Sequence, residues 1–186
     1  MNININDIKN GMTVIINGNL FLILEFQHVK PGKGPAFVRI KLKNLKTGST
    51  IEETFNTNIK VERAHVDKES MQFLYAQGNT YIFMNNTDYS QMEVDVQTLG
   101  DLAKYLKEGL EVVIHLFNGD IIGIDLPEKV EYLVTETSDA VKGNTSSGAM
   151  KDATIETGLT IKVPLFINQG ESIIITTKDG KYSSRA

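Results

Sequence analysis

The 186-residue sequence contains no cysteine and no tryptophan, and it has only three histidines and four prolines. Without cysteine the chain forms no disulfide, no thiolate zinc site and no iron–sulfur cluster, and it offers no thiol nucleophile. No run reaches the roughly 18 consecutive apolar residues that a membrane-spanning helix needs. Residues 1–12 lack the basic start and apolar stretch of a secretory signal. These absences lead us to expect a cytoplasmic protein.

Motifs for metal or covalent chemistry are also lacking. The three histidines, His28, His65 and His115, lie far apart in the sequence, so we expect no metal site and no cofactor. There is no Gly-x-Ser-x-Gly motif for an esterase-like serine. Residues 30–35 fail as a phosphate-binding P-loop, which needs a glycine five residues before its Gly-Lys pair and Ser or Thr after it. Nothing here predicts an enzyme.

Charge is distributed unevenly along the chain, although the total is only −4. Residues 1–64 hold nine Lys or Arg and five Asp or Glu, a net of +4. Residues 65–126 hold three basic and ten acidic residues, a net of −7. Residues 127–186 hold seven basic and eight acidic residues, a net of −1. This asymmetry indicates that the first segment meets phosphate and the second does not.

Short strands separated by turn residues dominate the sequence. Asn17-Gly18, Thr47-Gly48, Asn118-Gly119 and Asp179-Gly180 separate apolar or alternating runs, the pattern of hairpins. We expect strands at residues 13–16, 20–29, 36–45, 49–55, 72–76, 80–84, 92–96, 110–117, 120–125, 129–137, 158–164, 171–177 and 181–185. Strands of this length and spacing, in a chain with 15 glycines, favour small β-barrels.

The division into modules follows from charge and from one proline. The charge changes sign near residues 63–66, and Pro127 follows an alternating strand. We therefore predict an all-β chain of three modules in tandem, at residues 1–64, 65–126 and 127–186. One short helix is expected in the middle module, at residues 98–109, where leucines recur at three- and four-residue steps.

Lys33 stands at the centre of a palindrome, Pro31-Gly32-Lys33-Gly34-Pro35, between two strong strand signals. The glycines permit a tight reversal and the prolines restrict the backbone on both sides. The pattern predicts one long cationic side chain at the tip of a hairpin.

The strand after this loop adds three further cations. Arg39, Lys41 and Lys43 alternate with apolar residues, so a period of two places them on one face. A cationic tip above a cationic strand face suits an RNA backbone.

At these residues the sequence resembles bacterial elongation factor P. The resemblance is carried by residues 29–39 and 41–45 in the first module and by residues 123–127, 141–143, 153–158, 163–164 and 179–185 near the end. It implies a KOW/SH3-like barrel followed by two OB-fold barrels. It also implies a monomeric translation factor that binds the 70S ribosome between the peptidyl and exit sites and relieves stalling at consecutive prolines.

The resemblance also implies a role for individual residues. Lys33 would contact the CCA end of the peptidyl-tRNA carrying proline, in a loop shaped by Pro31, Gly32, Gly34 and Pro35. Backbone contacts to tRNA and ribosomal RNA would come from Lys30, Arg39, Lys41 and Lys43. The middle module would face a ribosomal protein on the stalk side of the exit site. RNA contacts near the end of the sequence would come from Tyr182, Ser184 and Arg185.

Two details of the resemblance concern the third module and the loop tip. Many relatives have Gly-Asp-Thr in a loop associated with the exit-site codon and the small subunit, whereas this sequence has Gly143, Asn144 and Thr145. In the family the tip residue is either modified by a dedicated enzyme or left as bare lysine. The two prolines, which stiffen the loop, favour bare Lys33 here.

Two other functions compete with this one. The first is a general OB or KOW RNA-binding protein without a ribosomal role, which predicts aromatic residues stacking on an exposed strand face. The second is a lysine-dependent enzyme, which needs a desolvated amine that a glycine-flanked hairpin tip does not provide.

Overall fold

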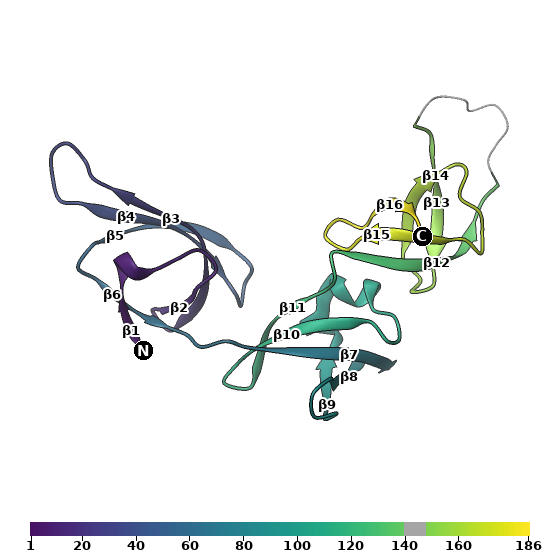
Figure 1. Ribbon diagram of the computed structural model, residues 1–186, viewed down its shortest axis with the longest axis horizontal. Coiled ribbons are helices and arrows are strands. Elements are labelled where there is room, and N and C mark those ends of the chain that lie inside the picture. The colour runs from purple at the N-terminus through teal and green to yellow at the C-terminus, as the bar shows by residue number, and fades with distance from the viewer. Residues whose placement is uncertain (140–147) are drawn as a thin grey trace. The chain divides into compact units, whose positions relative to one another are not determined.

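The computed structural model describes residues 1–139 and 148–186, and it is built almost entirely from β-strands (Figure 1). The strands form three antiparallel sheets that follow one another along the chain. One short α-helix and two 3₁₀ helices complete the described elements. The prediction of an all-β fold with one short helix in the middle segment is confirmed.

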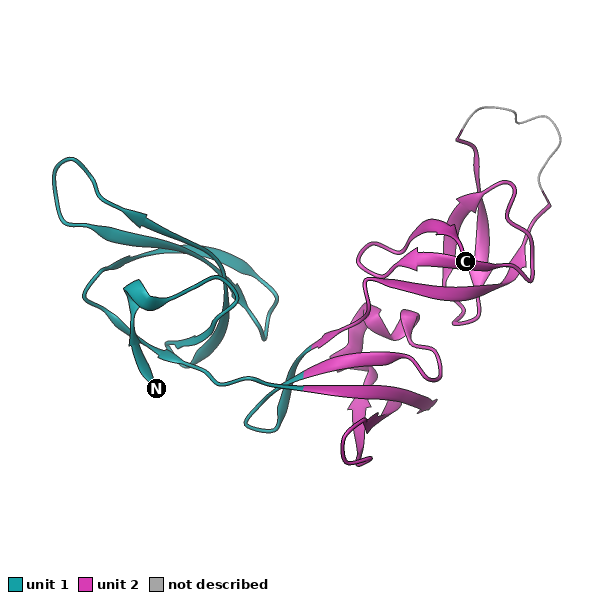
Figure 2. Ribbon diagram, in the orientation of Figure 1, with its two compact units in different colours: residues 1–68, 115–123 teal, residues 69–114, 124–186 magenta. Residues whose placement is uncertain are grey.

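The chain divides into two compact units (Figure 2). The first comprises residues 1–68 and 115–123, and the second comprises residues 69–114 and 124–186. Each sheet lies inside one of the three predicted modules. The module limits at residues 64 and 126 stay predictions.

The first sheet has six strands in the order β1-β6-β2-β3-β4-β5. Its strands are β1 (Asn2–Asn4), β2 (Thr13–Ile16), β3 (Asn19–Val29), β4 (Phe37–Asn44), β5 (Thr50–Asn56) and β6 (Lys60–Arg63), with the 3₁₀ helix η1 (Ile5–Asp7) after β1. On β4, Val38, Ile40 and Leu42 are completely buried. Burial of each of these side chains stabilises the fold by roughly 1.5–3 kcal/mol. The apolar side of β4 therefore faces the core, and its other side faces solvent.

Two of these strands have no signal in the sequence reading. β1 pairs with β6 through Ile3 and Val61, and both strands are short. β1 is Asn-Ile-Asn, and asparagine is depleted in strands. Such strands form because neighbouring strands supply hydrogen-bond partners, which local composition does not reveal.

The second sheet has five strands in the order β11-β10-β7-β8-β9. They are β7 (Asp67–Gln77), β8 (Thr80–Asn85), β9 (Gln91–Asp95), β10 (Glu111–Phe117) and β11 (Asp120–Asp125). The helical segment between β9 and β10 consists of α1 (Val96–Leu99) and the 3₁₀ helix η2 (Gly100–Tyr105).

The predicted limits of this helix, residues 98–109, are wrong. The helix begins two residues earlier because the Asp95 side chain accepts a hydrogen bond from the Gln97 amide at 2.7 Å and caps its start. It ends after one turn because Gly100 adopts φ +55°, and only the tighter 3₁₀ helix continues to Tyr105.

The third sheet has the order β14-β13-β12-β15-β16. Its strands are β12 (Lys129–Thr137), β13 (Met150–Ile155), β14 (Thr160–Pro164), β15 (Ser172–Thr176) and β16 (Lys181–Arg185). β13 has no counterpart among the predicted strands, since its lysine, aspartate and alanine are poor strand formers.

Within the second unit, β12 is joined by side-chain contacts to the end of η2 and the segment that follows it. Tyr132 is completely buried, and its hydroxyl donates a hydrogen bond to the Tyr105 carbonyl at 2.6 Å. The Lys107 ammonium lies 5.3 Å from the centre of the Tyr132 ring and donates to the Glu131 carbonyl at 2.5 Å. It also pairs with Glu156 at 3.4 Å. These contacts hold the second and third sheets together in one unit.

Over residues 1–139 and 148–186, no helix is long and apolar enough to cross a lipid bilayer.

Candidate nucleic-acid interface

The loop between β3 and β4 carries Lys33 at an exposed tip. In Figure 1 this loop continues beyond the ends of the strands beside it in the first sheet. Residues 30–35 are all exposed. Gly34 adopts φ +105°, a conformation that side chains with a Cβ atom rarely take, so glycine is required there for the backbone. The predicted hairpin tip is therefore present.

Lys33 makes no hydrogen bond or ion pair with any residue that the structure describes. The same holds for Lys30 at the start of the loop. No atom lies within 4 Å of the Cβ position at Gly32 or Gly34, so the space around the tip is open. The ammonium of Lys33 is thus available for an external partner.

Arg39, Lys41 and Lys43 lie on the solvent side of β4, as the period-two pattern predicts. β4 is flanked by β3 and β5, so the three cations stand in the middle of a three-stranded surface. Neither Lys41 nor Lys43 has an ion-pair partner among the described residues.

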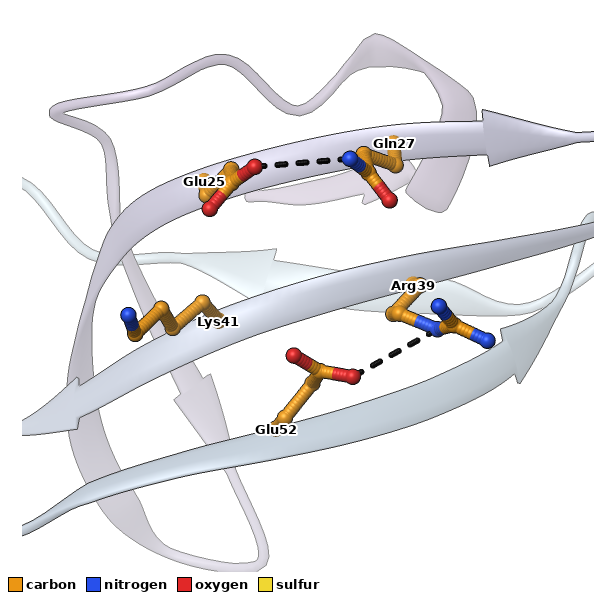
Figure 3. A pocket seen from close by; sticks show the side chains of 5 residues that line it. All are labelled: Glu25, Gln27, Arg39, Lys41 and Glu52. Atoms are coloured by element: carbon orange, nitrogen blue, oxygen red, sulfur yellow. Dashed lines mark hydrogen bonds and ion pairs between the residues drawn. The ribbon is translucent and has the colours of Figure 1, made fainter.

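Two carboxylates share this surface, and the sequence reading did not predict them there. Glu25 on β3 and Glu52 on β5 stand opposite Lys41 from either side. Glu52 Oε1 lies 3.4 Å from Arg39 Nε, and both side chains are about half exposed. A shallow polar depression of about 250 Å³ is lined by Glu25, Gln27, Arg39, Lys41 and Glu52 (Figure 3).

A β-bulge explains why Glu25 reaches this face. The register between β3 and β4 shifts between Ile23 and Glu25, with Leu24 at the irregularity. Without the shift, the alternation that buries Ile23 would also turn Glu25 inward. The bulge instead leaves Glu25 exposed and turns Phe26 toward the core.

Exposed ion pairs of this kind contribute only about 0–1 kcal/mol to stability. A phosphate group can therefore displace Glu52 from Arg39 at small cost. The two carboxylates partly neutralise the cations and so reduce the positive potential of this face.

We expect Glu52→Gln to strengthen binding of a fluorescent RNA hairpin about three- to ten-fold at low salt, because it releases Arg39 and removes a negative charge. Glu53→Gln is the matched control, since Glu53 lies next in sequence but pairs with Ile40, which belongs to the buried side of β4. The measurement is fluorescence anisotropy over a range of salt concentrations. Equal affinities for both variants would contradict a screening role for Glu52.

The predicted RNA contacts near the end of the chain lie on β16. Arg185 is already engaged there: Nη2 lies 3.2 Å from the Phe166 carbonyl and 3.4 Å from Glu171 Oε1. Its guanidinium also stacks 4.7 Å from the centre of the Phe166 ring. Hydrogen bonds from Asn168 and the charge of Arg185 lower the pKa of Glu171, so this pair is charged at neutral pH. Arg185 therefore has a structural role whatever else it contacts.

The other two residues of this group are less constrained. Tyr182 is half-buried and Ser184 is exposed. An RNA role for Tyr182, Ser184 and Arg185 stays a prediction. The predicted codon-side loop, Gly143, Asn144 and Thr145, lies outside the described residues.

No group of three or more His, Cys, Asp or Glu that could hold a metal ion occurs within residues 1–139 and 148–186. His65 pairs with the nearby Asp67 at 3.1 Å, in an exposed position.

Three family models match successive parts of the chain. The elongation factor P KOW-like domain matches residues 4–61, the elongation factor P OB domain matches residues 66–124, and the elongation factor P C-terminal domain matches residues 130–185. Lys33 and the basic face of β4 lie within the first of these matches.

Solved structures of similar fold include initiation factor 5A from Methanococcus jannaschii, at 25% sequence identity and a TM-score of 0.54. That alignment covers 68% of this chain and 94% of the other. An initiation factor 5A family protein from Naegleria fowleri is 19% identical with a TM-score of 0.51, over 68% of this chain and 98% of that one. About two thirds of this chain therefore shares its fold with these factors.

Proposed function

The chain belongs to the elongation factor P family, and from that membership we propose that it binds between the peptidyl and exit sites of the ribosome. Membership makes it a translation elongation factor that acts on the ribosome. In the proposal it stimulates peptide-bond formation and relieves stalling at consecutive prolines. It does so by holding the CCA end of the peptidyl-tRNA through Lys33.

The observation that carries this proposal is the exposed tip of the β3–β4 hairpin. It presents one cation with no partner among the described residues, on a loop whose backbone is restricted by two prolines and by the left-handed Gly34. Because the loop is already restricted, less backbone entropy is lost when Lys33 is fixed on a target.

The mechanism follows from the chemistry of proline, which is a poor donor and acceptor in peptide transfer. The Lys33 ammonium would donate hydrogen bonds to RNA oxygens at the CCA end and restrict its motion. Holding the reacting ester in position for attack accelerates the reaction without a covalent step by the protein. Lys33 would therefore be a positioning group, and the factor would not be an enzyme.

The charge distribution supports an arrangement on the ribosome. Residues 1–64, with a net charge of +4, would lie along the acceptor arm of the tRNA, where Lys30, Arg39, Lys41 and Lys43 neutralise phosphates. Residues 65–126, at −7, would face a ribosomal protein, and residues 127–186 would approach the small subunit. Glu25 and Glu52 would weaken the attraction between this segment and tRNA phosphates, and so favour reversible binding.

The experiment is reconstituted translation of a message with three consecutive proline codons. The factor is produced without any modifying enzyme, and its intact mass is measured to establish that Lys33 is bare. We expect the bare protein to relieve the stall and to leave a message without proline pairs unaffected. A protein that binds RNA but leaves the stall in place would instead be a general RNA-binding protein, and the proposal would be wrong.

A further inference from the structure

The depression on the first sheet is lined by carboxylates, although the surface around it is cationic. Glu25 on β3 and Glu52 on β5 line it from opposite sides, and β4 runs between them. Adjacent strands lie about 4.8 Å apart, so the backbones of β3 and β5 are separated by about 10 Å. Carboxylates in the middle of a phosphate-binding face repel phosphate, so we expect them to have a partner of another kind.

Both carboxylates have an acceptor to spare. Glu25 Oε1 accepts a hydrogen bond of 3.4 Å from the Gln27 side-chain amide. Glu52 Oε1 lies 3.4 Å from Arg39 Nε. The other oxygen of each glutamate, Oε2, has no hydrogen-bond or ion-pair partner among the described residues. Lys41 does not pair with either oxygen, and its side chain points away from Arg39 along β4 (Figure 3).

Hydrogen-bond donors and positive charge adjoin these acceptors. Arg39 uses Nε for its contact with Glu52, while its terminal nitrogens make no hydrogen bond with a described residue. Lys41 and Lys43 also lack an ion-pair partner in the described part of the chain. The depression therefore suits a ligand that carries negative charge beside N–H donors. A nucleotide of RNA has this combination, since its phosphate adjoins a base whose edge bears N–H groups.

Among the bases, guanine complements the two carboxylates best. Its Watson–Crick edge has N–H donors on adjacent nitrogens, N1 and the 2-amino nitrogen, whereas adenine and cytosine offer a single amino group there. This edge is accessible only where guanine is unpaired, as in a loop of folded RNA. At about 250 Å³ the depression is smaller than the pockets of about 300–1,000 Å³ that enclose drug-sized ligands, so it admits one base. A basic peptide also has N–H donors, but the cations of β4 would repel it.

We propose that Glu25 and Glu52 bind the Watson–Crick edge of one unpaired guanine while Arg39 and the neighbouring lysines hold the adjoining phosphates. This surface then distinguishes RNA loops by their bases as well as by their charge. The inference rests on the proposed function, in which the face lies along a tRNA that supplies the base. It gives the two carboxylates a part in recognition.

The test compares two fluorescent RNA hairpins that differ by one amino group. Both have a loop of uridines with one central purine nucleoside, which is guanosine in the first hairpin and inosine in the second. Inosine retains the N1–H donor and lacks the 2-amino group. By fluorescence anisotropy we expect the unsubstituted protein to bind the guanosine hairpin about three- to ten-fold more tightly, because inosine loses a hydrogen bond to a carboxylate.

The double variant Glu25→Ala/Glu52→Ala should bind both hairpins with equal affinity. The ratio compares two RNAs on the same protein, so the general gain in affinity from removing negative charge cancels. Both side chains are exposed and their contacts are weak, so the variant should stay folded. Glu53→Ala is the matched control, because Glu53 is paired with Ile40 on the buried side of β4, and it should keep the preference for guanosine.

Four results would overturn the inference. They are undetectable binding of the guanosine hairpin at low salt, equal affinities of the unsubstituted protein for the two hairpins, a preference that survives in the double variant, and a preference that Glu53→Ala also loses. If an arginine-rich peptide binds the unsubstituted protein but not the double variant, and the hairpins are bound alike, the carboxylates serve a protein partner instead.

The outcomes also separate this inference from the proposed function. If the factor relieves the stall at proline codons but binds the two hairpins alike, only the guanine contact is wrong. If it prefers guanosine but leaves the stall in place, the proposed function is wrong, and the base belongs to an RNA other than the peptidyl-tRNA.

Discussion

Lys33→Ala should remove most of the factor's effect on a message with consecutive proline codons while leaving the protein folded. The side chain is exposed and has no partner among the described residues, so its truncation breaks no contact that stabilises the first unit. A hydrogen bond from a charged donor contributes about 1.5–3 kcal/mol. Its loss at the reacting end of the tRNA corresponds to a rate of Pro–Pro bond formation lower by roughly 10- to 100-fold. Single-turnover peptide formation on purified stalled complexes measures this directly.

Lys46→Ala provides the control for that measurement. Lys46 is also an exposed lysine in a turn, but it follows β4 at the end opposite the loop that carries Lys33. Both variants remove one positive charge, so a general electrostatic effect would lower both rates equally. A selective loss for Lys33→Ala supports a local contact at the CCA end. Equal activity of Lys33→Ala and the unsubstituted factor would exclude the mechanism.

The basic strand was predictable because its pattern depends on local rules. A period of two assigns Val38, Ile40 and Leu42 to the core, and the structure buries all three. The cations between them must then face solvent, and the flanking turn signals set the limits of β4 to within one residue. The Lys33 loop followed for the same reason, since glycine and proline restrict the backbone by themselves.

The carboxylates on the same surface could not be predicted in this way. Glu25 reaches it because of a bulge at Leu24, and a bulge depends on how two strands pair rather than on the composition of either. Glu52 forms its ion pair because β5 lies beside β4 in a register that brings it near Arg39. The acidic component of the candidate site thus arises from pairing between strands.

Tyr89, which lies between β8 and β9 and has φ +62°, illustrates a second limit of the sequence. Its turn, Asn86-Thr-Asp-Tyr-Ser90, reads as an ordinary polar connection, and tyrosine is not a residue that suggests positive φ. The Tyr89 amide donates to the carbonyl of Asn85, which is buried and whose side chain donates to Glu69 on a neighbouring strand. The local sequence does not reveal this contact, because Glu69 lies 16 residues before Asn85.

Tyr132→Ala should lower the free energy of unfolding of the second unit by about 3–5 kcal/mol, because it leaves a large cavity where a completely buried ring lies. Tyr132→Phe retains the ring but leaves the Tyr105 carbonyl without its donor, which should cost about 1–3 kcal/mol. Burial also raises the pKa of the Tyr132 phenol, so the unfolded chain loses this proton at lower pH than the native one. The stability due to Tyr132 is therefore complete below the phenol's ordinary value near 10 and falls as pH rises above it.

Urea unfolding followed by circular dichroism, at neutral pH and near pH 10.5, tests both effects of Tyr132, and Tyr182→Phe serves as the control. Tyr182 is only half-buried, and its hydroxyl makes no hydrogen bond to any described residue, so the change should be within about 0.5 kcal/mol. The alkaline loss of stability should be smaller in Tyr132→Phe than in the unsubstituted protein, since the variant lacks the ionising group. If Tyr132→Phe and Tyr182→Phe had the same small effect, the Tyr132 hydroxyl would not help to fasten β12 to the segment after η2. The packing of its ring and the contacts of Lys107 would then hold the second unit together.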